Sequence, residues 1–289
     1  MTHGTAGGSD VWQAVSAALG SPVRDRRPLS GGDINEAYAV TLLDGRAFFV
    51  KTNRRPPAGM FPAEARGLAW LSQPGALRVP TVAAVDERFL ALELLRPAPR
   101  SASFEEDLGR GLATLHRAGA PGFGLDHDNF VGRLPQSNRP APDWSTFYRR
   151  ERLQPQLRRA VDAGVAPASL GHELDRLCAR LDVLVGPPEP PARLHGDLWG
   201  GNLMGDDRGA PCLIDPAAYG GHREIDLAMM RLFGGFGPRV FAAYAESYPL
   251  APGHEERVPL YQLYPLLVHV NLFGGSYLGA VSSALAGLL

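Results

Sequence analysis

Three polar residues in the second half of the chain have the types and the spacing that phosphoryl transfer requires. Asp197 is followed five positions later by Asn202, and Asp215 ends a short apolar stretch eighteen positions after Asp197. A phosphotransferase needs one carboxylate to orient and deprotonate the attacking hydroxyl, and two oxygen ligands to hold magnesium against the nucleotide phosphates. We therefore expect Asp197 to be the base, and Asn202 and Asp215 to be the Mg²⁺ ligands.

The residues around these three strengthen the interpretation. Positions 195–202 form the pattern H-x-D-x-x-x-x-N, which is typical of kinase catalytic loops, and Ile-Asp-Pro at 214–216 stands where protein kinases have D-F-G. The alternative is a hairpin whose Asp and Asn side chains form turns, although the combined spacing favours the catalytic loop. His195 is expected to hydrogen-bond the loop rather than to act as an acid or base.

The composition is typical of a globular cytoplasmic protein. The 289 residues suffice for one large domain or two lobes, and 45% of them are hydrophobic. With 29 basic and 30 acidic side chains, the net charge of −1 gives no support for a nucleic-acid-binding surface. Cys178 and Cys212 are far apart, which predicts neither a disulfide framework nor a cysteine-ligated metal. We found no signal-peptide pattern and no apolar run of membrane-spanning length.

Residues 1–95 are expected to form a small lobe that binds the nucleotide. Its predicted elements are a helix at 11–19, strands at 23–29, 34–43 and 46–51, a helix at about 62–71, and strands near 82–85 and 89–95. Residues 96–289 are expected to form a larger lobe with the catalytic loop and the substrate site. Its predicted helices cover 104–117, 143–153, 170–184, 225–233, 238–248 and, with interruptions, 258–285. Together these patterns predict an α+β fold.

The small lobe has the features of a nucleotide clamp. Gly31, Gly32 and Asp33 lie between two predicted strands, where backbone amides could approach a phosphate closely, although an ordinary turn is the alternative. Lys51 ends a strand that resembles the V-A-I-K strand of kinases, and Glu64 on the following helix is expected to pair with it. A solvated Lys and Glu without this contact are the alternative.

The strand at residues 89–95 runs into the proline-rich linker at 96–100, which is where a kinase-like protein binds adenine. Adenine is recognised there by backbone groups, so the side chains need only be apolar. By position, the carbonyl of Glu93 and the amide of Leu95 are the candidates. An ordinary core strand is the alternative, but the strand follows the lysine and the helix in the order that a kinase requires.

The chain resembles the fructosamine/ketosamine 3-kinase family, a branch of the aminoglycoside-phosphotransferase-like kinases, over nearly its whole length. Trp199, just after the catalytic aspartate, is more particular to this family than to kinases in general. The segments that carry the resemblance are GGDINEAY at 31–38, FVK at 49–51, HGDLWGGN at 195–202, IDPAAYGGHREIDLAM at 214–229, FGLDHDNFVGRLPQSN at 123–138 and HVNLFGGSY at 269–277.

The resemblance implies a two-lobed protein-kinase-like fold, with a small antiparallel-sheet N-lobe and a mainly helical C-lobe. It also implies ATP- and Mg²⁺-dependent phosphorylation of the 3-hydroxyl of ketosamines, the adducts that sugars form with lysine or free amines. The unstable 3-phosphate releases the amine, so the implied role is deglycation repair. Ribulosamines and erythrulosamines are expected before fructosamines. Small-molecule ketosamines or glycated protein lysines are the expected partners, without nucleic acid or membrane, and a monomer is slightly favoured.

A site for a ketosamine should combine an aromatic surface, hydroxyl acceptors and a carboxylate, because the substrate has several hydroxyls and a cationic amine. Trp199 is predicted to be the substrate platform, and a core tryptophan that braces the loop is the alternative. His269 and Asn271 interrupt an apolar helix and either bind substrate or satisfy a core network. Asp226 is expected to brace the catalytic loop. Weaker substrate candidates are Tyr219, Gln136 and Asn138.

Two other functions stay open. One is a kinase of another small amino-alcohol or of an aminoglycoside, against which the segment 129–138 and the Trp199 loop argue. The other is a catalytically inactive, nucleotide-binding pseudokinase. Pseudokinases usually lose the base, the lysine or a metal ligand, and this chain has all of them. Magnesium-dependent ATP turnover with a ribulosamine would separate the three functions.

Overall fold

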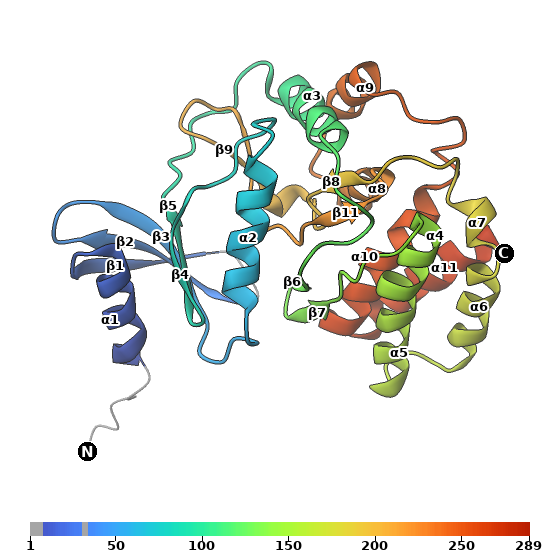
Figure 1. The fold of residues 1–289 in the computed structure, drawn as a ribbon, viewed down its shortest axis with the longest axis horizontal. Helices are drawn as coiled ribbons and strands as arrows, with labels where there is room; N and C mark the ends of the chain where they lie inside the picture. The colour runs from blue at the N-terminus through green and yellow to red at the C-terminus, as the bar shows by residue number, and fades with distance from the viewer. Residues whose placement is uncertain (1–7, 31–33) are drawn as a thin grey trace.

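The computed structural model of the protein describes residues 8–30 and 34–289. Figure 1 shows two lobes that follow one another along the chain. The first contains a five-stranded antiparallel sheet in the order β1-β2-β3-β5-β4 together with two helices, and the second is mainly helical. The predicted α+β class with two lobes is therefore confirmed. No helix within the described ranges is long and apolar enough to cross a membrane.

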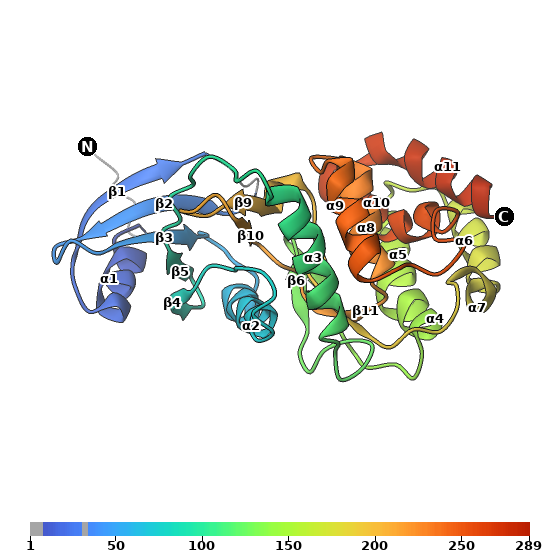
Figure 2. The same ribbon diagram turned by 90° about the horizontal axis from the view of Figure 1, so that it is seen from above.

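The small lobe packs one helix on each face of its sheet. Its elements are α1 (Gly8–Leu19), β1 (Val23–Leu29), β2 (Glu36–Leu42), β3 (Ala47–Thr52), α2 (Met60–Ser72), β4 (Val82–Asp86) and β5 (Phe89–Glu93). Val50 packs on the α1 side and Phe49 on the α2 side, because successive side chains of a strand point to opposite faces. Lys51 consequently shares the α2 face with Phe49. Figures 1 and 2 both place α2 between the sheet and the second lobe.

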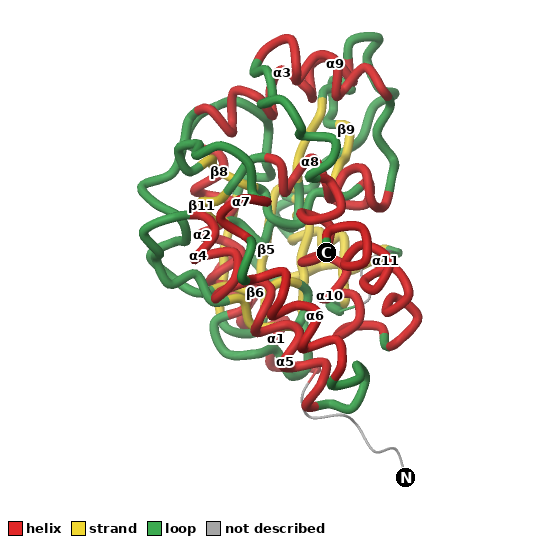
Figure 3. The backbone as a smooth tube through the Cα atoms, turned by 90° about the vertical axis from the view of Figure 1, so that its right-hand side faces the viewer, coloured by secondary structure: helices red, strands yellow, loops and turns green. Residues whose placement is uncertain are grey.

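The second lobe is built around α10, which is apolar on nearly all sides and is mostly buried. It contacts α5, α8 and α11, and Figure 3 shows α10 and α11 together at the C-terminal end of the molecule. The elements of this lobe are α3 (Phe104–Arg117), β6 (Asn129–Val131), β7 (Leu134–Gln136), α4 (Trp144–Phe147), a π-helix (Tyr148–Leu153), α5 (Gln154–Asp162), α6 (Ser169–Cys178), α7 (Leu181–Leu184), β8 (Ala192–Leu194), β9 (Leu203–Gly205), β10 (Pro211–Leu213), β11 (Tyr219–Gly221), α8 (Glu224–Phe233), α9 (Pro238–Ser247), α10 (Val258–Phe273) and α11 (Leu278–Leu288).

Two predicted helices differ from those observed. The helix expected at 143–153 continues through the π-helix into α5 and ends only at Asp162. Pro155 does not end the helix, because the amide of Gln154 bonds to the carbonyl of Arg149, and this wider π-type turn accommodates the proline. The helix expected at 170–184 is divided into α6 and α7. The three-residue strands β6, β7, β8, β9 and β11 were not predicted, because they are too short to show a periodic pattern.

Gly109, inside α3, tests the packing of α3 on α9, and Gly171, inside α6, serves as the control. A Cβ atom on Gly109 of α3 would lie 2.3 Å from the Val240 carbonyl oxygen, whereas a Cβ atom on Gly171 of α6 would meet open space. We expect Gly109→Ala to lower the free energy of unfolding by about 1–3 kcal/mol, because α9 has to move. Gly171→Ala should raise it by about 0.5–1 kcal/mol, because alanine favours the helix. Urea unfolding measures both changes, and a stabilising effect of Gly109→Ala would contradict this packing.

Candidate active site

A buried carboxylate on α8 holds the loop that carries Asp197. Asp226 is fully buried, and its two carboxylate oxygens accept hydrogen bonds from the backbone amides of His195 (2.8 Å) and Gly196 (2.9 Å). Burial raises the pKa of Asp226, but the hydrogen bond and charge of His116, with the loop amides, outweigh burial and hold the pKa below its ordinary value. The prediction that Asp226 braces the catalytic loop is therefore confirmed.

His116 is a site residue that sequence reasoning missed. Its Nε2 lies 3.2 Å from the Asp226 carboxylate, and its Nδ1 lies 2.8 Å from the hydroxyl of Tyr244. Both His116 and Asp226 have completely buried side chains, so each provides the other with a partner that water cannot supply. In the sequence, His116 stands in the last turn of α3, where basic residues are common at helix ends. No feature of the sequence distinguished it from such a residue.

His195 is a structural residue of the loop, as predicted. Its Nδ1 accepts a hydrogen bond from the Asp197 amide (3.3 Å), and its Nε2 therefore donates to the Ile214 carbonyl (2.9 Å). Burial lowers the pKa of His195, which keeps the ring neutral. The next residue, Gly196, has a φ of 82°, and a Cβ atom there would lie 2.1 Å from the Ala217 carbonyl oxygen. Only glycine fits this turn.

The structure brings Asp197, Asn202 and Asp215 together, as the spacing predicted. The side-chain nitrogen of Asn202 donates to the Asp197 carbonyl (2.8 Å) and to Asp197 Oδ2 (3.1 Å), and it lies 3.5 Å from the Asp215 carbonyl. The backbone reinforces this arrangement, because the Ile214 amide donates to the Asn202 carbonyl at 3.1 Å. Asp215 has a φ of 55°, which places it in the left-handed region that non-glycine residues rarely occupy.

Lys51 joins the small lobe to this group of residues. Its ammonium nitrogen lies 2.7 Å from Glu64 Oε1 on α2 and 2.5 Å from Asp215 Oδ1. Burial lowers the pKa of Lys51, but the charges of Asp215 and Glu64 outweigh it and raise the pKa, so the side chain is a cation. The predicted pairing of Lys51 with Glu64 is confirmed. The contact with Asp215 was not predicted, because no spacing rule connects residues so far apart in the chain.

Asp197 and Asp215 differ in their electrostatic surroundings. Burial is the main cause that raises the pKa of Asp197 to about 7; the hydrogen bond from Asn202 opposes this rise, and the charges of Asp215 and Asp226 add to it. Asp215 has the Lys51 cation beside it, and its side chain is 40% exposed. A carboxyl group with a pKa near neutrality can take up a proton and release it again at physiological pH.

Asn202 and Asp215 fit a magnesium ion that also contacts nucleotide phosphates. Among the described residues, no group of three or more His, Cys, Asp or Glu side chains could enclose a metal ion. Magnesium, however, commonly takes one or two protein oxygens and completes its shell with water and phosphate. Neither Asn202 Oδ1 nor Asp215 Oδ2 accepts a hydrogen bond from the described part of the chain, so both oxygens are available.

The predicted substrate residues lie in three different settings. Trp199 is 42% exposed, and its ring covers Gly201, where a Cβ atom would lie 2.2 Å from the ring; it is therefore no core tryptophan. His269 is half-buried, and its Nδ1 bonds to the Pro265 carbonyl at 2.8 Å. The side-chain nitrogen of Asn271 bonds to Gln156, which leaves only its oxygen for a substrate.

The predicted nucleotide residues are only partly described. Gly31, Gly32 and Asp33 lie outside the described residues. Glu93 ends β5, and its amide bonds to the Thr81 carbonyl at 2.9 Å. No described residue accepts a hydrogen bond from the Leu95 amide, and its role toward adenine stays a prediction.

A buried polar network supports the chain segment after Asp215. The side-chain nitrogen of Gln136 donates to the Ala217 carbonyl at 3.1 Å, and Arg152 donates to Asn138 Oδ1 at 2.7 Å. The guanidinium group of Arg152 also lies 3.8 Å from the centroid of the Tyr219 ring. Gln136, Asn138 and Tyr219, the weaker substrate candidates, are all buried and serve this network. Arg152 was not predicted, because a charged residue in a helical pattern normally indicates an exposed face.

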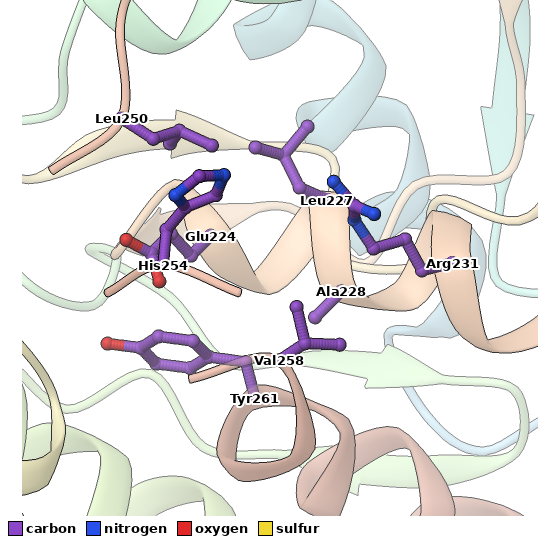
Figure 4. A pocket seen from close by; sticks show the side chains of 8 residues that line it. All are labelled: Glu224, Leu227, Ala228, Arg231, Leu250, His254, Val258 and Tyr261. Carbon is purple, nitrogen blue, oxygen red and sulfur yellow. The ribbon is translucent and has the colours of Figure 1, made fainter. Parts of the chain in front are cut away.

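Figure 4 shows a pocket between α8 and the start of α10, lined by Glu224, Leu227 and Tyr261 among others. Its volume is about 10 Å³, which is room for one water molecule at most. Glu224 is bonded to Arg257, with the closest contact at 2.6 Å, so the polar group in this pocket already has its partner. This hollow is a packing gap and not a substrate site.

Comparison with known proteins agrees with this geometry. The sequence model of the fructosamine kinase family matches residues 9–289. A probable ketoamine kinase of Thermus thermophilus is 42% identical over 259 residues, which are 90% of this chain and 92% of that protein. The crystal structure of a putative fructosamine-3-kinase from Thermobifida fusca is 41% identical, has a TM-score of 0.89, and covers 96% of this chain and 98% of its own.

More distant structures share the architecture. The aminoglycoside phosphotransferase APH(4)-Ia is 16% identical, with a TM-score of 0.63 over 96% of this chain and 98% of its own. At this identity the likeness concerns the fold alone, and it agrees with a two-lobed, kinase-like architecture. The match of the family model across almost the entire chain is far more specific. The chain belongs to the fructosamine kinase family.

Proposed function

We propose that the protein is an ATP- and Mg²⁺-dependent kinase that phosphorylates the 3-hydroxyl of ketosamines. The observation that carries this proposal is the meeting of Asp197, Asn202, Asp215 and Lys51 at one place, with Trp199 exposed beside them. A carboxyl group whose pKa burial raises to about 7 suits a base that accepts a proton from a sugar hydroxyl. The names of the relatives support ketosamines as the substrate class.

In this proposal, the oxygen at the 3-position of the sugar attacks the γ-phosphorus of ATP. A bond forms between that oxygen and phosphorus, the bond to the oxygen that bridges the β- and γ-phosphates breaks, and Asp197 takes the hydroxyl proton. Lys51, held by Glu64, contacts the α- and β-phosphates. Asn202 and Asp215 would hold Mg²⁺, which supplies charge neutralisation on the phosphates when it is bound.

Backbone and loop groups of the small lobe complete the proposed nucleotide site. The Glu93 carbonyl and the Leu95 amide are the proposed contacts to the adenine edge, and Gly31, Gly32 and Asp33, which lie outside the described residues, are the proposed contacts to the phosphates. In the described ranges the Leu95 amide lacks an acceptor, which supports its role. On this proposal, residues 1–95 form the nucleotide clamp, and residues 96–289 carry the catalytic loop and the substrate site.

Trp199 and His269 are the proposed contacts to the sugar. The Trp199 ring presents an exposed face against which sugar carbons can pack. The Nδ1 atom of His269 must carry its hydrogen, because its partner, the Pro265 carbonyl, can only accept. Burial lowers the pKa of His269, so the ring is neutral and its Nε2 is an acceptor for a hydroxyl or an ammonium group. The Oδ1 atom of Asn271 is a further proposed acceptor.

The proposed role of the enzyme is deglycation. The 3-phosphate of a ketosamine is unstable and releases the amine, so phosphorylation removes the sugar. The first substrates we expect are ribulosamines and erythrulosamines, formed on free amines or on protein lysines. We place this reaction in the cytoplasm, carried out by a monomer.

Turnover assays test this function directly. Wild-type enzyme should release ADP with a ribulosamine and not with kanamycin, and Asp197→Asn should lower kcat by about 10²–10⁴-fold, the usual cost of losing a general base. Nucleotide affinity, measured by titration calorimetry, should be nearly unchanged in this variant, because Asp197 does not bind the nucleotide. Phosphorylation of kanamycin but of no ketosamine would contradict the proposed substrate class. Near wild-type turnover by Asp197→Asn would exclude Asp197 as the base.

The raised pKa of Asp197 also predicts a cost in stability. Its pKa is about 7 in the folded protein and about 4 in an unfolded chain. The contribution of Asp197 to the free energy of unfolding is therefore fully present below pH 4, and it is lost as the pH rises through 7. Asp197→Asn abolishes the titration, so the variant should be more stable than wild type at pH 8 by about 1–4 kcal/mol. Urea unfolding from pH 4 to pH 8 without nucleotide should show this gap growing with pH, and a constant gap would contradict the assignment.

A further inference from the structure

Four aromatic side chains gather at the C-terminal end of α10. Phe233 of α8 stacks on His269 with 4.3 Å between the ring centroids, and Phe273 and Tyr277 lie 5.4 Å and 5.1 Å from the His269 ring. We call Phe233, His269, Phe273 and Tyr277 the α10 aromatic cluster. Phe273 is 47% exposed, and the other three rings are half-buried. The cluster therefore has an open side that the rest of the described chain does not cover.

The local sequence explains why these rings meet. His269 and Phe273 are four residues apart, which places them on the same face of α10. The helix then ends at Gly274, which has a φ of 92°, and a 3-10 turn leads into α11. This break returns Tyr277 to the same face, where the centroid of its ring lies 6.4 Å from the centroid of the Phe273 ring. Arg133 donates to the Leu272 carbonyl at 2.9 Å and holds the end of the helix.

The cluster adjoins the catalytic loop. A Cβ atom on Gly200 would lie 3.2 Å from the Cα atom of Gly235, so the chain just after Trp199 touches the chain just after Phe233. Among the large hydrophobic side chains that are exposed in the described ranges, the two aromatic ones are Trp199 and Phe273. Trp199 adjoins this contact on the loop side, and Phe233, the cluster member two residues before Gly235, adjoins it on the other side.

The chemistry of the cluster suits an apolar group. No member carries a charge at pH 7, because burial lowers the pKa of His269 and the other three residues are Phe or Tyr. Flat apolar rings bind a chain or a ring by removing its surface from water. In a ketosamine whose 3-hydroxyl lies at Asp197, the nitrogen is attached to carbon 1, two carbons from the reacting position, so its substituent extends beyond the sugar and reaches groups next to the catalytic loop.

We propose that the Phe and Tyr rings of the α10 aromatic cluster bind the substituent on the ketosamine nitrogen and prefer an apolar chain or ring to a small group, which leaves Nε2 of His269 for the sugar or the amine. This inference rests on the proposed function, since it identifies the part of the substrate that determines which amines are processed. The enzyme then acts best on adducts of amines with long apolar chains or rings, and the butyl chain of lysine is one such group.

Ribulose adducts of methylamine, butylamine and phenylethylamine test the proposal, because they share the sugar and the charged secondary amine and differ only in apolar size. With wild-type enzyme, kcat/KM should rise about tenfold or more from the methylamine to the phenylethylamine adduct, which corresponds to about 1.4 kcal/mol. Phe273→Ala should reduce this ratio to about twofold, and Phe273→Leu should give an intermediate ratio. Leu43→Ala, at a site on the small lobe that is 60% exposed, is the control and should keep the wild-type ratio.

Each outcome has a distinct meaning. A wild-type ratio near one would overturn the proposed subsite and leave the ketosamine kinase intact. The same holds if Phe273→Ala or Phe273→Leu, with a wild-type Tm, keeps the full ratio. If the wild-type enzyme phosphorylates none of the three adducts, the proposed function itself is wrong, and the subsite fails with it. Loss of the ratio in Leu43→Ala as well would show that the effect is not specific to the cluster and would also overturn the subsite.

Discussion

The contact of Lys51 with Glu64 and Asp215 is the interaction on which the rest of the site depends. One ammonium group joins β3, α2 and the chain after β10, at distances of 2.7 Å and 2.5 Å from the two carboxylates. Removing one member of such a buried group leaves an uncompensated charge, which is costly. The sheet therefore has to present Lys51 on its α2 face, and the second lobe has to hold Asp215 at a φ that few residues adopt. The two lobes are thus joined where the nucleotide is proposed to bind.

A second constraint, the buried Asp226, separates the roles of the two carboxylates in the site. Asp226 fixes the backbone of the catalytic loop beside Asp197, whose carboxylate accepts a hydrogen bond from the uncharged side chain of Asn202. Burial then raises the pKa of Asp197 to about 7, whereas Asp215 lies against the Lys51 ammonium. A carboxyl group with a pKa near neutrality can exchange protons at physiological pH, whereas the contact with the Lys51 cation suits Asp215 to its proposed role as a metal ligand. The raised pKa of Asp197 that suits it to be the proposed base also lowers the free energy of unfolding of the protein at neutral pH.

Motif spacing predicted the parts of the site that lie on short, local segments. Asp197, Asn202 and Asp215 are on one loop and hairpin, and the Lys51–Glu64 pair joins adjacent elements, so patterns in the chain indicated them. His116 and Arg152 were missed because their roles arise from contacts between segments that are more than a hundred residues apart or from a buried network. Most helices were placed to within a few residues, whereas the three-residue strands of the second lobe are defined by their partners and not by periodicity.

In the proposed reaction, these residues transfer phosphate to the 3-hydroxyl of a ketosamine. The most direct test is to incubate the wild-type enzyme with Mg²⁺, ATP and a ribulosamine, and to locate the phosphate on the product by phosphorus–proton correlation NMR before the product decomposes. We expect one new phosphate ester, whose phosphorus is coupled to the proton on carbon 3, followed by release of the free amine. A phosphate on any other carbon, or a product that keeps its amine indefinitely, would contradict it.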